Sequence, residues 1–541
     1  MPPVHAARLS RLAVLVGSSL LAAACDPNNQ GLAPPGDELF FPSGIMLDRR
    51  AQAEGRAARW LFVANGNNDL AYNSGTVVAL DLDAFYAAWT ADQSTMEVDP
   101  YCGDDRCVLN VGYDTTDEHP CRRLALRPSV VECDERKFVK SSVRIGDFAT
   151  LLTSSCEQSG EGRCDHSRLW LPVRGDPSVT FIDLAEYDDG DVKFSCGAPD
   201  TITLDGDQPV VSQHNAHRCA KDHRITRQRN DEDLPELDRE PFQMLISPSF
   251  RYAYVAHADA QTLSIIALDG LRKPNGETTG TPALIESAGV FQDPSGLTGG
   301  FGLAERPCNP QGNAPSLTNG CTRPLVYGGF RYLQRLARFT VQGVDFADPD
   351  EAADKCLAPG EDLDTPGKLN CDPRVRSYIQ ILPGGLDPSS TQFRPTLGDI
   401  AFGDDDGNEL YVVQTAPGAL LKLDTSLGPD GEPFDTPSAP PIELCEEPTR
   451  MKIYREGGQR FAAISCFRAA ELFIIDLDAF RLTNVVQLGT GPYEIEVDED
   501  RGVLYVGNSL ERSISVIDLS RERSTRFQEI ARIGLQEPFM R

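Results

Sequence analysis

The chain has 541 residues and a formal net charge of −30, with 81 acidic residues against 51 basic ones. This excess of carboxylates argues against nucleic acid and against anionic lipid headgroups as general partners, because both are negatively charged. Hydrophobic residues make up 40% of the chain, which is enough to bury a core and excludes a largely disordered protein.

Residues 1–24 have the pattern of an export signal peptide. Arg8 and Arg11 flank the start of an apolar run that is too short to cross a bilayer as a mature helix. The run ends in LLAAAC, and its small residues before Cys25 resemble the lipobox of bacterial lipoproteins. This resemblance implies that acylated Cys25 anchors the exported protein to a membrane of the bacterial cell envelope, outer or inner. Ordinary signal-peptidase cleavage is the alternative. Residues 25–38 then form a flexible tether.

Export also decides how the 15 cysteines are interpreted. An even number, 14, remains after Cys25, and this count in an exported chain favours disulfides between neighbours in sequence. Zinc is the competing interpretation, but the chain contains no C-x-x-C motif. The neighbouring pairs are Cys102/Cys107, Cys121/Cys133, Cys156/Cys164, Cys196/Cys219, Cys308/Cys321, Cys356/Cys371 and Cys445/Cys466.

Seven stretches share one pattern, in which an apolar strand, a short polar turn and a second strand follow one another. They are residues 59–85, 167–184, 250–269, 323–341, 408–424, 459–480 and 501–520. A further strand precedes each stretch and another follows it, so each unit is expected to hold four short antiparallel strands. In this scheme residues 107–112 close the first unit, and residues 142–152 open the second.

Seven such units within residues 39–541 predict an all-β fold, a single seven-bladed β-propeller. Two β-sandwiches are the alternative, but seven regular four-stranded units argue against them. Insertions near 86–142, 205–240 and 345–375 interrupt the units and hold seven of the 15 cysteines. Disulfides there would restrain loops that lack a core of their own.

The strand sequences carry a family resemblance. YVGN at residues 505–508, FVAN at 62–65 and SISVIDL at 513–519 resemble the YVTN family of β-propeller repeats. The resemblance implies a toroidal propeller, and it implies no single activity. Some similar propellers are lactonases, or hold metals or quinones through histidines and acidic residues at the central channel. Only His257 stands at such a place here, so we expect no cofactor and no catalytic residue.

Propeller geometry points to a binding site at the mouth of the central channel. Because strands alternate in direction, the ends of all second strands and the starts of all first strands share one face. The candidates on this face are Asn65, Arg174, His257, Arg331, Arg394, Gln414, Arg450, Arg468 and Asn508. Several arginines at one mouth suit carboxylate or phosphate groups. The alternative is that they only form ion pairs with local acidic residues.

Two segments have the composition of weak metal sites. GDDDGNE, with Asp404 and Asp406, groups carboxylates as calcium loops do, but it falls at an expected strand turn and lacks the EF-hand spacing. His214, His217 and His223 could ligate a metal, but they lie in a polar insertion without helical periodicity. We interpret the first as a turn and the second as a solvated loop.

Two function hypotheses remain. The lack of a catalytic motif favours an anchored binding or scaffolding module for an envelope protein, peptide or glycan. The alternative is an envelope enzyme of lactonase or quinoprotein type with its site at the channel mouth.

Overall fold

A computed structural model gives the fold of the chain. The structure describes residues 32–535, with gaps at 50–56, 96–119, 125–126, 159–163, 186–191, 198–203, 206–207, 210–218, 227–235, 248–251, 271–279, 294–298, 308–323, 343–373, 382–395 and 430. Predictions for Cys25, His214, His217 and Arg394 therefore lie outside the described residues. Among the described helices, none is long and apolar enough to cross a membrane.

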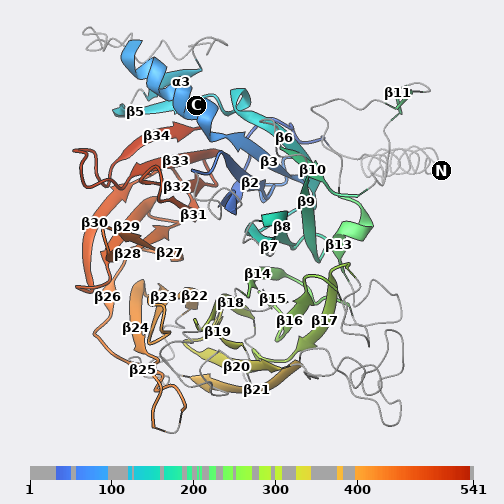
Figure 1. Cartoon of the computed structure of the whole chain (residues 1–541), viewed down its shortest axis with the longest axis vertical. Helices are drawn as coiled ribbons and strands as arrows, with labels where there is room; N and C mark the ends of the chain where they lie inside the picture. The colour runs from blue at the N-terminus through green and yellow to red at the C-terminus, as the bar shows by residue number, and fades with distance from the viewer. Residues whose placement is uncertain are drawn as a thin grey trace, which may run out of the picture.

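Seven β-sheets stand as blades around a common axis, as the sequence predicted (Figure 1). The innermost strands are β1 (Pro42–Leu47), β7 (Thr153–Gln158), β14 (Pro241–Ile246), β18 (Gly300–Glu305), β22 (Thr396–Phe402), β27 (Pro448–Glu456) and β31 (Pro492–Asp498). The second strands are β2 (Trp60–Asn65), β8 (Cys164–Val173), β15 (Tyr252–His257), β19 (Leu325–Phe330), β23 (Glu409–Ala416), β28 (Gln459–Cys466) and β32 (Val503–Asn508).

The outer half of each blade is made of a third and a fourth strand. The third strands are β3 (Gly75–Asp81), β9 (Ser178–Ala185), β16 (Leu263–Ala267), β20 (Leu336–Gln342), β24 (Ala419–Asp424), β29 (Glu471–Asp476) and β33 (Ser513–Asp518). The fourth are β6 (Val139–Ile145), β10 (Lys193–Ser195), β17 (Ala283–Ala288), β21 (Arg374–Ile381), β25 (Thr436–Pro437), β30 (Arg481–Gln487) and β34 (Glu529–Ile533). Short strands β13 (Arg224–Ile225) and β26 (Ile442–Glu443) extend blades 2 and 5.

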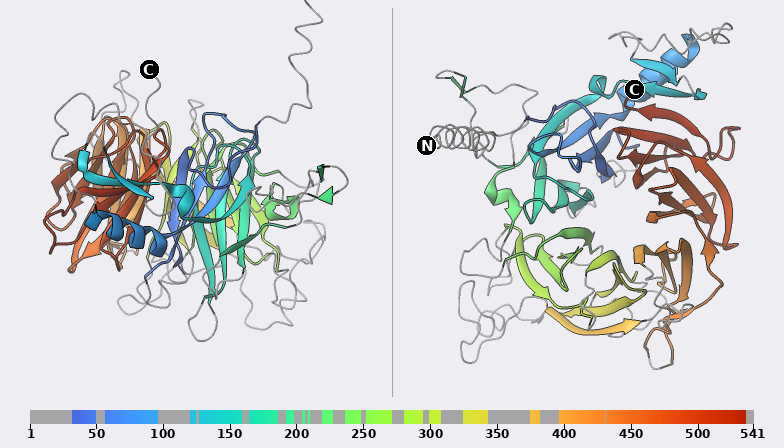
Figure 2. Two further views of the ribbon diagram at one scale, coloured as in Figure 1. Left: turned by 90° about the horizontal axis from the view of Figure 1, so that it is seen from above. Right: turned by 180° about the vertical axis from the view of Figure 1, so that it is seen from behind.

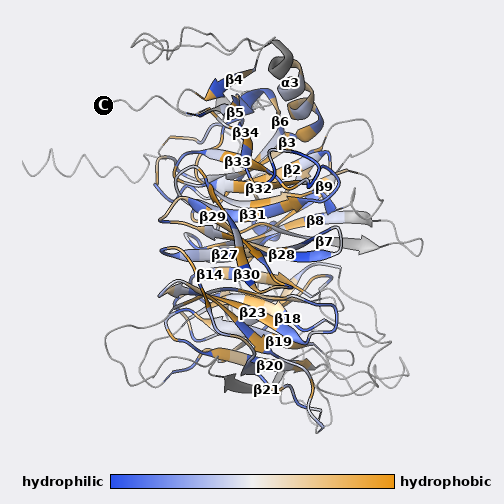
Figure 3. Ribbon diagram, turned by 90° about the vertical axis from the view of Figure 1, so that its left-hand side faces the viewer, coloured by the Kyte–Doolittle hydropathy of each residue, from blue (hydrophilic) through white to orange (hydrophobic). Residues whose placement is uncertain are grey.

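The core lies between neighbouring blades, and strand β32 shows why. Its alternate side chains point to opposite faces of the sheet. Tyr505 packs into a cluster with blade 1, whereas Leu504 and Val506 pack into a cluster with blade 6. A strand buried on both faces reads as a continuous apolar run, which is the pattern of the second strands. Figure 3 shows the result, with hydrophobic residues along the strands and hydrophilic ones towards the turns.

The first insertion joins the beginning of the propeller to its end. After β3 the chain forms helix α3 (Leu82–Thr95) and the hairpin of β4 (Cys121–Leu124) and β5 (Arg127–Cys133). Strand β5 pairs in parallel with β34, so blade 7 contains six strands (Figures 1 and 2). Tyr86 on α3 and Tyr505 on β32 share a hydrogen bond of 3.0 Å between their hydroxyls. An insertion from blade 1 therefore holds blade 7 in place.

The boundary between blades 1 and 2 differs from the sequence prediction. Residues 142–145, expected to open blade 2, belong to β6, which pairs with β3 as the outer strand of blade 1. Residues 107–112 lie outside the described residues. The chain leaves blade 1 at Gly146, where a Cβ atom would lie 2.0 Å from the Asp176 side chain. Residues 142–152 are thus divided between two blades, and Gly146 marks the crossing.

Three of the predicted cysteine pairs are confirmed as disulfides: Cys121–Cys133, Cys196–Cys219 and Cys445–Cys466. The first closes the β4–β5 hairpin on blade 7, and the last ties the segment after blade 5 to β28 of blade 6. The other four pairs fall on residues whose side chains lie outside the described part of the chain.

Candidate functional site at the channel mouth

The ends of the second strands lie beside the starts of the first strands. Asn65 faces Pro42 in blade 1, and Asn508 faces Pro492 in blade 7. His257 faces Pro241 in the same way in blade 3. These positions define one face of the propeller, which we call the mouth.

Three of the candidates at strand ends are completely buried and hydrogen-bonded within their own blades. Each bonds to a hydroxyl on the adjacent third strand, and the donor–acceptor distances are 2.8–2.9 Å: Asn65 with Thr76, His257 with Ser264, and Asn508 with Ser515. Their polar groups therefore link the second strand to the third. The Oδ1 atom of Asn508 is buried and has no hydrogen-bond partner among the described residues.

His257 and Gln414 are also held inside the fold. The other ring nitrogen of His257 lies 3.0 Å from the Arg239 carbonyl, and burial lowers the pKa of the ring. Its imidazole is therefore neutral at neutral pH. Gln414 accepts a hydrogen bond from Gln334 at 2.9 Å and donates one to the Pro417 carbonyl at 2.8 Å.

Three of the candidate arginines converge on one aromatic ring. Arg174 follows β8 of blade 2, Arg331 follows β19 of blade 4, and Arg450 lies on β27 of blade 6. Their guanidinium carbons lie 5.6, 5.7 and 5.7 Å from the ring centroid of Phe242, on β14 of blade 3. These are distances at which a cation is attracted to a ring face. We call these four residues the Phe242 cluster.

Each arginine of the Phe242 cluster has a carboxylate partner. Arg174 pairs closely with Glu240, and Arg450 lies 3.4 Å from Glu494. Arg331 lies 3.4 Å from Asp259, and 30% and 50% of the two side chains are exposed. A long ion pair so open to water is weak. Arg331 is therefore the cation of the cluster that a ligand could engage at least cost.

Arg450 spans the central channel. Its side chain is buried, donates from Nη1 to Gln243 on blade 3, and donates from Nη2 to the Tyr493 hydroxyl on blade 7 at 3.1 Å. Burial raises the pKa of Glu494, beside Arg450, to about 7, although Arg450 opposes this shift. The Glu494 side chain keeps 21% of its surface exposed. Its carboxyl therefore changes protonation near neutral pH in a partly open place.

The remaining arginine candidate stands apart from the cluster. Arg468 is 65% exposed and pairs with Glu446 at 3.0 Å and with Glu447 at 3.2 Å. Such exposed pairs contribute little to stability or to a specific site.

The GDDDGNE segment forms a turn between β22 and β23. The Asp404 carboxylate accepts the backbone N–H groups of Asn408 and Glu409 at 3.0 Å. Arg306 donates to the Asp406 carbonyl at 3.1 Å, which places a guanidinium where a calcium ion would need a free oxygen. Across the described residues, no group of three or more His, Cys, Asp or Glu could hold a metal.

Sequence reasoning missed two aromatic residues of the mouth, Phe242 and Phe301. Phe242, Phe301 and Tyr493 each occupy the second position of an innermost strand. The rings of Phe242 and Phe301 lie 4.8 Å apart, and Arg450 lies over both. An alignment of the first strands of the seven units would have shown this recurring aromatic position.

The fold and this site define the chain as a seven-bladed β-propeller protein. No protein-family model matches the chain, and no curated protein does. Solved structures that resemble it include the periplasmic gluconolactonase PpgL of Pseudomonas aeruginosa, at 13% identity and a TM-score of 0.40, covering 83% of this chain and 86% of that one. A putative 6-phosphogluconolactonase of Bacteroides fragilis has 11% identity and a TM-score of 0.40, covering 73% and 89%.

A third similar structure is the β-propeller domain of Cps50 (Swd1) from Myceliophteria thermophila. It has 10% identity and a TM-score of 0.39, covering 89% of this chain and 99% of that one. Likenesses this distant carry no information about chemistry.

Proposed function

We propose that this protein is a lipid-anchored binding protein of the bacterial cell envelope, and that the Phe242 cluster holds an acidic segment of a protein or peptide partner. The observation that carries the proposal is the convergence of Arg174, Arg331 and Arg450, from three different blades, on one ring at the mouth. The anchor is proposed at Cys25, on the lipobox-like sequence alone.

An acidic partner fits the charges at the mouth. The whole chain carries a net charge of −30, whereas at the mouth three guanidinium groups balance three carboxylates, so the mouth is less acidic than the chain as a whole. A partner carboxylate could replace Asp259 beside Arg331, since that contact is long and open to water. The guanidinium then forms the planar, two-bond contact that arginine makes with carboxylates.

The test is calorimetric titration of the purified chain with a glutamate-rich peptide and with a glutamine-rich peptide of equal length. We expect only the acidic peptide to bind, and its affinity to fall as salt rises. Arg331→Gln should weaken this binding about fivefold or more, as the loss of one charge-assisted contact implies. The matched control is Arg455→Gln, on the same innermost strand as Arg450 but at its opposite end. Equal affinity for the two peptides, or an unchanged Arg331→Gln variant, would overturn the proposal.

The anchor is tested separately in a bacterial host. The full chain should incorporate a labelled fatty acid and sediment with membranes, whereas Cys25→Ala should do neither. Labelling that persists in Cys25→Ala would contradict the assignment of this cysteine.

Glu494 favours a second candidate function, an envelope enzyme of the lactonase type. A carboxyl with a pKa of about 7, partly open to the channel, is suited to moving a proton at neutral pH. If lactones are substrates, Glu494→Gln should abolish their hydrolysis while the fold persists. A panel of sugar lactones with no turnover above background would remove this candidate, and the absence of a visible chromophore in the purified protein would remove its quinoprotein form.

A further inference from the structure

A separate pocket lies at the outer side of blade 7, away from the mouth. It has a cavity volume of about 540 Å³ and lies between helix α3, strand β5 and strands β32–β34. Asp500 and Arg501 line it from the turn between β31 and β32, which is the end of β32 opposite to Asn508. The volume lies within the range of pockets that enclose small ligands, roughly 300–1,000 Å³.

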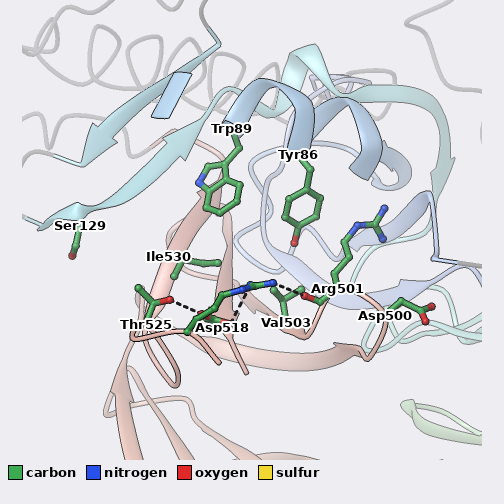
Figure 4. Close-up of a pocket in the computed structure, with 10 residues that line it drawn as sticks. Tyr86, Trp89, Ser129, Asp500, Arg501, Val503, Asp518, Thr525 and Ile530 are labelled. Atoms are coloured by element: carbon green, nitrogen blue, oxygen red, sulfur yellow. Dashed lines mark hydrogen bonds and ion pairs between the residues drawn. The ribbon is translucent and has the colours of Figure 1, made fainter. Parts of the chain in front are cut away.

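One wall of this pocket is aromatic. Tyr86 and Trp89, one helical turn apart on α3, extend from the helix towards Val503 and Ile530 on the strands of blade 7 (Figure 4). Their rings meet edge to face at a centroid distance of 5.8 Å. The guanidinium of Arg501 already covers the Tyr86 ring, at 5.2 Å from its centroid. The Trp89 ring therefore offers the aromatic surface on which a ligand could stack.

The cations of the pocket are already neutralised. Arg501 pairs with Asp83 at 2.6 Å and with Asp498 at 2.9 Å. Arg523 pairs with Asp518 at 3.2 Å and is half exposed. A ligand anion would have to displace these carboxylates, so the pocket is poorly suited to phosphate or carboxylate groups.

Other polar groups of the pocket remain available. Among the described residues, Asp500 and Ser129 have no hydrogen-bond or ion-pair partner, and both are exposed. The Nε1 donor of Trp89 is buried and has no acceptor in the part of the chain that the structure describes. The half-exposed guanidinium of Arg523 has further N–H donors. Asp500 and Ser129 lie at opposite ends of the pocket, on either side of the Trp89 and Tyr86 rings (Figure 4).

We infer that this pocket binds a neutral oligosaccharide, which stacks the apolar face of one ring on Trp89 and bonds through the hydroxyls of its units to Asp500, Arg523 and Ser129. A sugar hydroxyl both donates and accepts, so it satisfies a carboxylate and a guanidinium in one site. A purely apolar ligand would leave these groups desolvated and unpaired. An organic cation is disfavoured, because Arg501 already occupies the Tyr86 face and lies beside the site. The inference does not depend on the proposed function of the mouth.

Tryptophan emission can report this binding directly. The chain has three tryptophans, and Trp60 and Trp170 are buried in the blades. A ligand in the pocket should therefore change the emission of Trp89. The probes are glucose, N-acetylglucosamine and their β1,4-linked disaccharides, with tetramethylammonium and inorganic phosphate as the cationic and anionic comparisons.

We expect at least one saccharide to shift the emission saturably, and the two ions to have no effect. Saturation-transfer NMR should detect the same saccharide, in the wild type and in Trp89→Phe, whose ring still stacks. Trp89→Ala and Asp500→Asn should each weaken binding about tenfold in the NMR titration, as losing a stacking face or a charged hydrogen bond implies. The Arg455→Gln control should bind normally.

Circular dichroism and the thermal midpoint show whether Trp89→Ala still folds, and Asp500→Asn tests the site without changing its packing. The inference is overturned if no saccharide binds at tens of millimolar. It is equally overturned if either ion binds in place of the sugars, or if both Trp89→Ala and Asp500→Asn bind as well as the wild type.

Discussion

Arg450 donates a hydrogen bond to the side-chain oxygen of Gln243, 207 residues earlier in the chain, from blade 6 to blade 3. Innermost strands of non-adjacent blades can meet only across the axis of the ring, so this contact spans the central channel. Tyr493 on blade 7 accepts a second bond from the same guanidinium at 3.1 Å. One side chain thereby connects three blades.

Replacing Arg450 should therefore destabilise the propeller strongly. Arg450→Met removes a buried cation and leaves Glu494 and Asp399 without its charge. We expect the free energy of unfolding in urea to fall by about 3–5 kcal/mol, as for other broken buried pairs. The control Arg468→Met, at an exposed pair on the same face, should change stability by less than about 1 kcal/mol. Equal effects of the two substitutions would show that Arg450 does not hold the channel.

Glu305 should make the protein less stable as pH rises through the weakly acidic range. Burial raises the pKa of this carboxyl to about 7, from 4.5 in the unfolded chain. The folded state thus keeps a proton that the unfolded state releases, and the free energy of unfolding falls between about pH 4.5 and 7. Glu305→Gln should remove this part of the pH dependence, and should stabilise the protein above pH 7 by up to about 3 kcal/mol.

The measurement is the free energy of unfolding in urea for the wild type and for Glu305→Gln across this pH range, and the difference between the two proteins is compared. Glu135 and Glu494 shift in the same direction and remain in both proteins, so they cancel in the difference. The exposed Glu522→Gln control should leave the pH profile unchanged. A Glu305→Gln profile parallel to the wild type would contradict the assignment.

Asn65 should behave as a structural residue. Its side chain donates to Thr76 at 2.9 Å and accepts the Phe40 N–H at 3.1 Å. Asn65→Ala leaves these buried groups unpaired, which we expect to cost about 1–3 kcal/mol in the free energy of unfolding. The Asn65→Ala variant should bind the acidic peptide as tightly as the wild type. The surface control Gln528→Ala should have the same free energy of unfolding as the wild type. If Asn65→Ala loses peptide binding but keeps its stability, Asn65 contacts the ligand and is not a purely structural residue.

The disulfide of the β4–β5 hairpin should stabilise the closure of the ring. The bond Cys121–Cys133 closes a loop with a sequence separation of 12. Replacing both cysteines by serine should lower stability by about 2–3 kcal/mol, through the loop entropy of the unfolded chain. Hydrogen exchange should show faster exchange at β34, the strand that pairs with β5. If exchange at β34 stays as slow as in the wild type, the hairpin is not needed to hold the outer edge of blade 7.

The candidate site could be predicted in position but not in detail. The pairing of Asn65 with Pro42 and of Asn508 with Pro492 follows from strand alternation, so the mouth and its members could be identified from the repeats. Whether a side chain at a strand end faces solvent or the adjacent strand depends on its χ angles and neighbours, and Asn65 and His257 turn inwards. The convergence of Arg174, Arg331 and Arg450 on Phe242 depends on how four different blades are placed in space.

The amino-acid sequence by itself determined the seven blades, because hairpins are local. Short apolar runs and polar turns of a few residues lie together in each repeat, as in Val503–Asp518, so they can be recognised without distant contacts. Only the tertiary structure decided which blade the chain joins after a long insertion. The assignment of Val139–Ile145 to blade 1 and the pairing of β5 with β34 depend on contacts between segments far apart in sequence. No local pattern encodes such pairings, since their energy comes from surfaces that form only when the ring closes.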